Sequence, residues 1–301
     1  MEILANIKNL DLLPQYQRSG VNGFIVNSLF SIKNYFTPAQ VDTINKYCRI
    51  KKIKFYVNVD VLVSEEDIED LHRYLDYIHS LGPDGIYFSD LAVLYYMNLK
   101  GYKTQLIYDP STLNTNDLDV SFYLNQGVDV VLARELTIRE VVDIVKNHPK
   151  QIDMQVFGHL RMSYSKRKFL SNYFKEIEEK IDVDSVDDLS LIEESRNYKL
   201  PIRENIYGTA IYTDYVLLMY EELAYLTSAL KRAIIDTEFV PEEIAIEVIR
   251  DIRRLSKDNA KFLSDNIKNS HFYIDFSNGY LYQKTTDKKE NDEKDWIISA
   301  S

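Results

Sequence analysis

The fold of this chain is decided by residues Lys54–Phe88, which read KFYVNVDVLVSEEDIEDLHRYLDYIHSLGPDGIYF. Two short apolar runs, Lys54–Val59 and Gly85–Phe88, stand on either side of a segment in which apolar residues recur at helical spacing. Acidic residues follow Ser64, where a helix dipole favours negative charge in the first turn. This order is typical of parallel strands joined by crossover helices.

The same alternation runs along most of the chain and predicts eight strands, the number that a TIM barrel requires. The predicted strands are Glu2–Ala5, Gly23–Val26, Lys54–Val59, Gly85–Phe88, Thr104–Tyr108, Asp129–Leu132, Ile152–Phe157 and Ala233–Asp236. Capping boxes at Thr37–Gln40 and Thr137–Glu140 mark two of the helix starts between them. We therefore predict an α/β fold of the TIM-like (β/α)8 barrel class.

The regular alternation breaks between the seventh and eighth strands, which predicts an insertion over residues 174–212. Its first part, Phe174–Asp188, reads as an acidic helix and loop, and Tyr198–Ile211 reads as a hairpin. After the eighth strand, Pro241–Ile267 has the pattern of a long closing helix, and His271–Tyr282 that of a small hairpin. The predicted organisation is a barrel over residues 1–240, a closing helix and hairpin over 241–282, and a mobile tail over 283–301 that Trp296 docks.

Composition limits the classes of function. The formal net charge of −11 argues against a protein that coats nucleic acid nonspecifically, because phosphate neutralisation needs a surplus of Lys and Arg. Cys48 is the single cysteine, and the sequence shows neither a secretory leader nor an apolar run long enough to span a bilayer. We expect a cytoplasmic protein without membrane contact. The spacing of His72, His79 and His148 predicts no metal site.

In a parallel barrel the working residues follow the strands, so the polar residues at strand ends are the candidates for a site. They are Asn27, Ser28, Asp60, Ser89, Asp90, Asp109, Ser111, Arg134, Glu135 and Asp236–Glu238. Arg134 is suited to grip a carboxylate or phosphate through two parallel hydrogen bonds while Glu135 orients it. An internal ion pair is the alternative for these two residues, and a helix cap is the alternative for Asp90.

The segment Gln155–Phe174, QVFGHLRMSYSKRKFLSNYF, resembles the signature of peptidase family U32, the collagenase-like proteases. LARELT at Leu132–Thr137 and GIYFSDLAVL at Gly85–Leu94 resemble two further motifs of that family. The matching signature residues are Tyr164, Ser165, Arg167, Leu170, Ser171, Asn172 and Tyr173. His159 does not match, and a lone histidine of this kind is more often structural than catalytic.

The chain departs from the family pattern where members with an iron–sulfur cluster read approximately HGALC-x-x-YSGRC-x-LSNY. Arg161 and Lys168 stand at the first two cysteine positions, and Phe157 stands at the histidine. Cluster iron needs thiolates, which a guanidinium or an ammonium does not replace, so we expect no cluster. A K-I-E-G-R-M-type ending of strand eight is also replaced by Ala233–Phe239, which lacks the arginine. The resemblance thus implies the loss of two parts of the presumed active centre.

From these motifs we predict two sets of site residues. The candidates for catalysis are Arg134, Glu135, Tyr164 and Ser165. The candidates for substrate binding are Asp90, Arg134, Arg161, Lys166, Arg167, Lys168 and Asn172. Arg161 and Lys168 either attract an anion or pair with nearby acids. The cluster Ser165–Lys168, followed by Lys175, forms either a local basic patch or a solvated turn.

The resemblance is to the shorter, cluster-lacking U32 proteins of Gram-positive bacteria, and it implies a role in tRNA modification. In that role the chain is a non-cluster subunit or helper of the prephenate-dependent 5-hydroxylation of wobble uridine, with no cofactor of its own and prephenate as co-substrate. Its expected partners are a cluster-bearing U32 paralogue and tRNA. The alternatives are a U32 peptidase and a binding barrel without chemistry. The 23 tyrosines also suit a homodimer interface.

Overall fold

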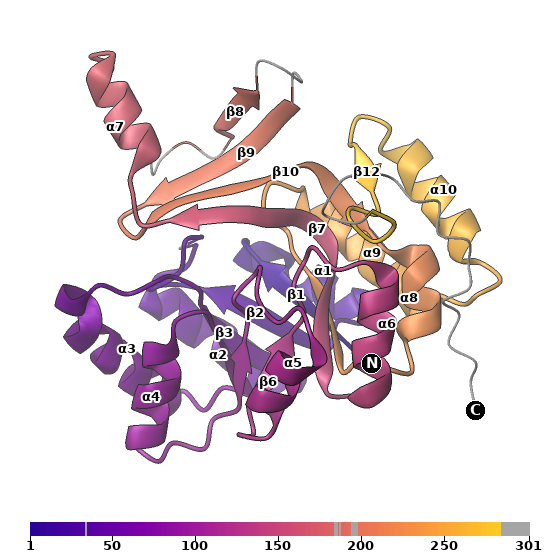
Figure 1. The fold of residues 1–301 in the computed structure, drawn as a ribbon, viewed down its shortest axis with the longest axis horizontal. Coiled ribbons are helices and arrows are strands. Elements are labelled where there is room, and N and C mark those ends of the chain that lie inside the picture. Colours follow the sequence, from indigo (N-terminus) through magenta and orange to yellow (C-terminus); the bar gives the residue numbers. More distant parts are fainter. Residues whose placement is uncertain (34, 184–185, 187, 194–197, 284–301) are drawn as a thin grey trace.

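The computed structural model describes residues 1–33, 35–183, 186, 188–193 and 198–283. Its centre is a closed barrel of eight parallel strands, seen in the lower half of Figure 1. In chain order these strands are β1 (Glu2–Ile7), β2 (Gly23–Asn27), β3 (Lys54–Val59), β4 (Gly85–Phe88), β5 (Leu106–Tyr108), β6 (Asp129–Val131), β7 (Ile152–Ser165) and β11 (Arg232–Ile235). The predicted TIM-like (β/α)8 barrel is confirmed.

Strand β11 closes the barrel because it pairs in parallel with the first and the seventh strand at once. Glu2 of β1 lies opposite Arg232, and Arg232 lies opposite Asp153 of β7. Leu4, Ile25, Tyr56, Tyr87, Ile107, Val131 and Ile234 fill the barrel interior as one buried cluster. Beneath it Arg232 donates to Asp153 at 2.8 Å, and burial raises the pKa of this carboxyl to about 6 although Arg232 opposes the shift.

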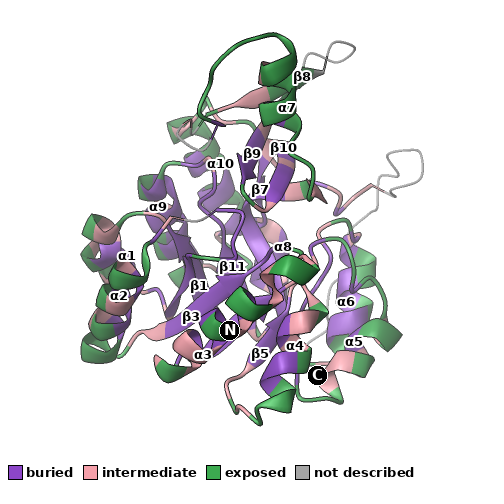
Figure 2. Cartoon of the chain, turned by 90° about the vertical axis from the view of Figure 1, so that its left-hand side faces the viewer, coloured by how far each residue is buried: buried purple, intermediate pink, exposed green. Residues whose placement is uncertain are grey.

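Helices cover the outside of the barrel, so the strands are buried and the outer helix faces are exposed (Figure 2). These helices are α1 (Leu13–Ser19), α2 (Pro38–Lys51), α3 (Ile68–Ser80), α4 (Leu91–Leu99), α5 (Asp117–Leu124), α6 (Ile138–Asn147), α8 (Tyr220–Leu226) and α9 (Glu242–Arg253). Thr37 and Thr137 form the predicted capping boxes at the starts of α2 and α6. Ser64 precedes a short 3-10 helix, Glu65–Asp67, and makes no side-chain capping bond there.

The insertion between the seventh and eighth barrel strands forms a projecting arm, which rises above the barrel mouth in Figure 1. Strand β7 continues past the barrel to Ser165 and pairs with β10 (Gly208–Leu218), which forms a hairpin with β9 (Tyr198–Asn205). Helix α7 (Phe169–Glu176) and strand β8 (Ser190–Glu193) complete this arm. Strand β7 can pass beside β11 because residue 158 is glycine, with φ +110° and a Cβ position only 2.3 Å from the Asp236 carbonyl oxygen.

The C-terminal part differs from the prediction in two respects. The expected long helix is divided into α9 and α10 (Ala260–Ser270), because Asn259 stabilises a turn by accepting from Ser256 N and donating to Arg254 O. The expected hairpin is instead a single short strand, β12 (Phe276–Ser277), which pairs in parallel with β10. Trp296 and the rest of the predicted tail after Gln283 lie outside the described residues.

Candidate functional site

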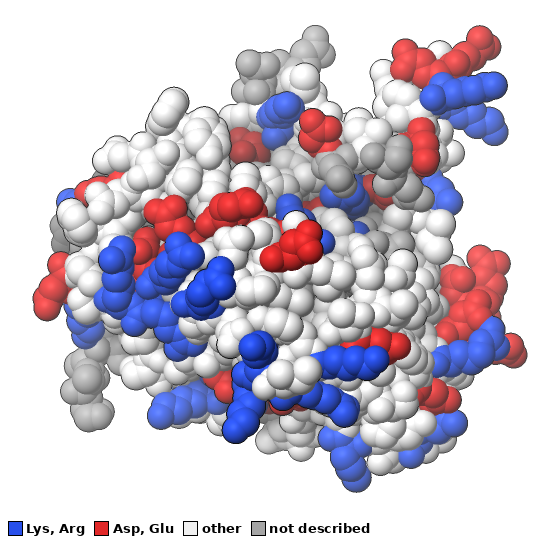
Figure 3. All heavy atoms as spheres, turned by 180° about the vertical axis from the view of Figure 1, so that it is seen from behind, with Lys and Arg blue, Asp and Glu red and all other residues white. Residues whose placement is uncertain are grey.

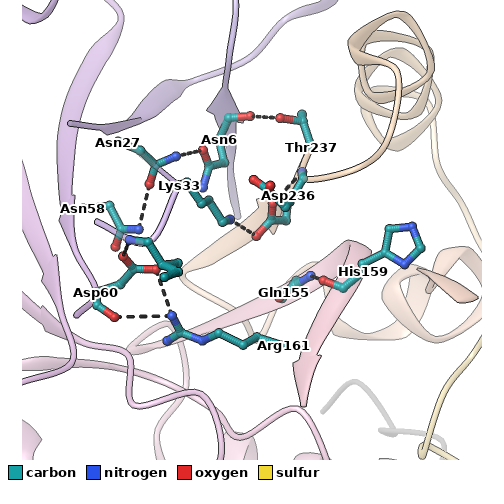
Figure 4. Close-up of polar contacts among 12 residues, drawn as sticks. Asn6, Asn27, Lys33, Asn58, Asp60, Gln155, His159, Arg161, Asp236 and Thr237 are labelled. Carbon is teal, nitrogen blue, oxygen red and sulfur yellow. Dashed lines mark hydrogen bonds and ion pairs between the residues drawn. The ribbon is translucent and has the colours of Figure 1, made fainter. Parts of the chain in front are cut away.

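Polar side chains converge at the carboxyl ends of the barrel strands and enclose a cavity of about 30 Å³. Figure 4 shows the centre of this group, which we call the mouth cluster. The cavity is lined by Asn6, Ile25, Lys33, Asn58, Asp60, Tyr87, Asp109, Arg134, Gln155, Arg161, Tyr212, Ile234 and Asp236. A space of this size holds about one water molecule or one small polar group of a ligand.

Three asparagines form a chain across the first three strands. Asn58 donates from Nδ2 to Oδ1 of Asn27 at 2.8 Å, and Asn27 donates from Nδ2 to Oδ1 of Asn6 at 2.5 Å. All three side chains are buried. A carboxamide carries both donors and acceptors, so this relay fixes the orientation of each amide without any net charge.

Arg161 lies in the mouth cluster and not at the surface. Its Nη1 donates to Oδ2 of Asp60 at 3.0 Å, and its Nε donates to Oγ of Ser111 at 2.8 Å. Asp60 also accepts from the backbone N–H of Ile32 at 3.1 Å, which ties the loop after β2 to the cluster. Of the two roles predicted for Arg161, pairing with a nearby acid is the one seen.

Arg134 grips a carboxylate of the protein itself. Its Nη1 and Nη2 donate to the two oxygens of Asp109, each at 2.9 Å, and its Nε donates to Gln155 at 2.8 Å. Burial would raise the pKa of Asp109, but the charge and hydrogen bonds of Arg134 outweigh it and hold that pKa below the ordinary value. Glu135 is exposed, so the ion pair of Arg134 is made with a different residue from the one the sequence suggested.

Lys33 and Asp236 form the third ion pair, with Nζ 2.6 Å from Oδ2. Burial again raises the pKa of the Asp236 carboxyl, and the adjacent Lys33 ammonium lowers it to a net value below the ordinary one. Lys33 was not predicted, because a lysine in the loop after β2 carries no signal in sequence that it turns inward. The mouth cluster therefore contains three cations matched to three carboxylates.

The hydroxyl of Tyr212 is the one side-chain nitrogen or oxygen atom of the lining residues that is buried without a hydrogen-bond partner among the described residues. Tyr212 is 1% exposed and comes from β10, in the arm. An unpaired buried hydroxyl is costly, so it marks a position where a water or a ligand oxygen would be favourable. Sequence reasoning missed this residue because it lies in the insertion.

Most of the remaining predicted residues have structural partners. Asp90 accepts from Ala92 N and Val63 N, both at 2.9 Å, so it caps α4. Tyr164 donates to the Tyr207 carbonyl at 2.9 Å, and burial raises the pKa of its hydroxyl to about 12. Ser165 accepts from the backbone N–H of Arg167 at 3.2 Å.

The predicted basic residues Lys166, Arg167 and Lys168, together with Asn172, are exposed on the arm and away from the mouth cavity. Lys166 Nζ contacts the hydroxyl of Ser64. Seen from behind, the tip of the arm at the upper right of Figure 3 carries both acidic and basic side chains. Of the predicted substrate-binding set, Arg134 and Arg161 thus share the mouth cluster and the others do not.

His159 has a structural position. Its ring points away from the mouth cluster in Figure 4, and its Nδ1 donates to the Thr213 carbonyl at 2.7 Å. Burial lowers the pKa of this imidazole below the ordinary value. Ser165 lies at the far end of the same extended strand, about 20 Å away, which is beyond hydrogen-bond reach. These two residues do not form a nucleophile and base.

Metal-binding clusters and membrane-spanning helices are both absent from the described part of the chain. In those residues no three or more His, Cys, Asp or Glu side chains are grouped so as to hold a metal ion. His72 and His79 stack instead on Tyr96 and Tyr102, with ring centroids 3.8 and 3.7 Å apart. Nor does this part of the chain contain a helix with the length and apolar character needed to cross a membrane.

Comparisons with known proteins place these features in a wider group. The sequence model of peptidase family U32 matches residues 23–183. The tRNA hydroxylation protein P2 of Bacillus subtilis is 28% identical over 226 residues, covering 73% of this chain and 73% of that protein. A collagenase of Porphyromonas gingivalis is 30% identical over 187 residues, covering 56% of this chain and 44% of the collagenase. The solved U32 peptidase Mk0906 is 12% identical with a TM-score of 0.48, covering 78% of this chain and 92% of its own.

Proposed function

The chain belongs to peptidase family U32, and from this premise we propose that it takes part in hydroxylation of tRNA, as a non-cluster subunit or helper in the prephenate-dependent formation of 5-hydroxyuridine at the wobble position. The similarity to the tRNA hydroxylation protein P2 of Bacillus subtilis supports this role over most of the length of both chains. The bound co-substrate would be prephenate, and the chain would act in the cytoplasm.

The observation that carries the proposal is the position of Arg161. At a signature position where the resemblance places a thiolate, this chain has a guanidinium held by Asp60 and Ser111 inside the barrel mouth. A guanidinium stays protonated and has no redox chemistry, so this residue supplies charge and hydrogen bonds only. Any redox step of the reaction would then fall to a cluster-bearing U32 partner.

The arm provides a surface for RNA. Lys166, Arg167 and Lys168 follow each other at the turn between β7 and α7, and all three are exposed. Contacts of this kind to phosphates position RNA without reading its sequence. A chain with net charge −11 needs such a local surface, since its average charge repels nucleic acid.

The test of this role is the nucleoside content of purified tRNA from a strain in which the gene is deleted. We expect the 5-hydroxyuridine-derived wobble nucleosides to disappear or fall sharply, and a plasmid copy of the gene to restore them. If the deletion strain keeps its wild-type content of these nucleosides, the role is wrong.

The partner is tested by purification of the tagged chain from its native host without oxygen. We expect a second U32 protein, one that carries the cluster cysteines, to be recovered with it. If the chain is recovered without such a protein, at a salt concentration low enough to retain tRNA, the hypothesis that it is a subunit of a complex is contradicted. The hypothesis that it is an independent helper would then remain.

A peptidase is the second candidate, and the similarity to the collagenase favours it. His159 and Ser165 do not meet, so the structure lacks the nucleophile and base of a serine peptidase at these residues. We therefore expect no cleavage of denatured collagen or casein by the purified chain. Cleavage that is lost on Glu135→Gln would favour the peptidase instead.

A further inference from the structure

A second and larger cavity lies between the arm and the barrel, on the side of β7 to which His159 points. This cleft measures about 630 Å³. Its lining comes from five places in the chain, namely the end of β1, the loop after β2, His159 of β7, the β8–β9 part of the arm and the loop after β11. The lining residues used below are Lys8, Tyr35, Asp188, Lys199, Arg203 and Phe239.

The back wall of the cleft is a layer of two aromatic rings with an arginine between them. The guanidinium carbon of Arg203 lies 5.7 Å from the ring centroid of Tyr35 and 5.3 Å from that of Phe239. Arg203 also donates to Glu238 from Nη2 at 2.9 Å, and Tyr35 donates to the same carboxylate. Cation–π contacts and a buried ion pair hold this wall rigid before any ligand binds.

Phe239 has an unusual backbone. Its φ is +57°, a value that is rare for a bulky residue, and the neighbouring rings of Tyr212 and His159 pack edge-on against it at 5.2 and 6.2 Å. The ring is half-buried although it lines the cleft. Strained conformations of this kind are concentrated at binding and catalytic sites, where surrounding contacts maintain them.

Cations stand at the margin of the aromatic wall. Lys8 donates one of its three N–H groups to the Val240 carbonyl at 3.0 Å, and Lys199 is exposed on β9 across the cleft. Asp188 is the acidic residue of the lining, and the buried Glu238 carboxylate neutralises Arg203, so two cations, Lys8 and Lys199, remain against one carboxylate. The lining is therefore net positive in a chain whose total charge is −11.

We propose that this cleft binds single-stranded RNA, with one unstacked base against Phe239 and the adjoining phosphates at Lys8 and Lys199. Aromatic platforms combined with a cationic groove are the usual means of holding single strands, since every base has a π-face. The inference rests on the proposed function, because tRNA is the RNA that such a protein would meet. The proposed ligand of the cleft is an unpaired segment of that tRNA.

The cleft is one side chain away from the mouth cluster. Tyr212 lines the mouth cavity and packs its ring against Phe239, which lines the cleft. Glu238 in the wall donates its backbone N–H to Asp236 of the mouth cluster at 2.9 Å. A base held against Phe239 would thus lie one side chain away from the cavity that contains the unpaired Tyr212 hydroxyl.

The test is fluorescence anisotropy of a short labelled single-stranded RNA with the purified full chain, compared with the same RNA annealed to its complement. We expect the single strand to bind more tightly than the duplex. Phe239→Leu should weaken binding by about fivefold or more, because leucine lacks the aromatic face on which a base stacks. Phe239→Tyr should leave binding unchanged, because tyrosine retains that face. Thermal unfolding of each variant controls for loss of the fold.

The lysines are tested with a matched control. Lys199→Gln should weaken binding and reduce the slope of log affinity against log salt concentration by about one. Lys103→Gln, at the opposite end of the barrel before β5, should change neither the affinity nor the slope. Equal effects of these two substitutions, equal binding of single and double strands, wild-type affinity in Phe239→Leu, or the absence of binding would each overturn the proposal. If the gene deletion still removes the wobble nucleosides in that case, the tRNA role stands and only the cleft assignment fails.

Discussion

Arg161 and Asp60 face each other inside the barrel mouth, with Nη1 and Oδ2 3.0 Å apart and both side chains only 9% exposed. The two residues come from β7 and from the end of β3, so their pairing connects the signature segment to the opposite half of the barrel. Without Arg161 the Asp60 carboxylate would be buried and uncompensated. The ion pair therefore holds two opposite strands together at the mouth, and it also neutralises the buried Asp60 carboxylate.

The Arg161–Asp60 ion pair predicts a large loss of stability when one partner is removed. Arg161→Met should lower the free energy of unfolding by about 3–5 kcal/mol, because a buried carboxylate is left unpaired. Adding Asp60→Asn should recover part of this loss, since the amide keeps an acceptor for Ile32 N and removes the charge. Urea unfolding of the single and double variants measures both changes.

The control for this experiment is the exposed pair of Arg73 and Asp70 on α3, whose side chains are 70% and 62% exposed. Arg73→Met should change the free energy of unfolding by less than about 1 kcal/mol. Similar losses in Arg73→Met and Arg161→Met would show that the mouth pair has no special role.

Glu204 predicts a local effect confined to the arm. This carboxylate is 2% exposed and accepts from Leu170 N at 2.7 Å and Ser171 N at 2.9 Å, at the start of α7. Glu204→Ala should cost about 1–3 kcal/mol locally, because two helix N–H groups and the Ser171 hydroxyl lose their acceptor. Hydrogen exchange of the amides at the start of α7 should accelerate, while exchange in β1–β6 stays unchanged. Unchanged protection of α7 would contradict the anchor role.

Gly208 predicts a steric effect at the hairpin of the arm. Its φ is +133°, and a Cβ there would lie 2.1 Å from the Ser165 carbonyl oxygen, so Gly208→Ala must displace β10 from β7. Gly101→Ala is the matched control, because φ is +67° and nothing lies within 4 Å of its Cβ position. We expect a loss of stability of roughly 1 kcal/mol in the control and clearly more in Gly208→Ala. Equal melting temperatures of the two variants would contradict this.

The mouth carboxylates predict how stability depends on pH. The pKa values of Asp109 and Asp236 are lowered in the folded state, so the unfolded chain binds more protons than the folded chain in the acidic range. Their contribution is complete above the ordinary value of 3.8 and is lost as the pH falls below it. Unfolding free energies measured at falling pH should decline less steeply in the Lys33→Met/Asp236→Asn variant. An identical slope in both proteins would contradict the lowered pKa of Asp236.

The barrel could be predicted from sequence because its strands are short apolar runs in a regular order, and capping residues such as Thr37 and Thr137 act locally. All eight predicted strands form. The division of the closing helix could not be predicted, because the apolar pattern continues through the turn that Asn259 stabilises.

The site was less predictable, because its pairs join residues far apart in the chain. Arg134 was predicted at the mouth, but its partner Asp109 comes from the neighbouring strand, and its sequence neighbour Glu135 points to solvent. Lys33 and Tyr212 come from a loop and from the insertion, where no periodic pattern indicates which side chains turn inward.

The most direct measurement for the proposed role is hydroxylation of tRNA in an anaerobically prepared extract of the deletion strain. The extract is supplied with prephenate and with tRNA isolated from the same strain, with and without the purified chain. We predict that 5-hydroxyuridine forms at the wobble position only when the chain is added. Equal formation without the chain would contradict its participation in the reaction.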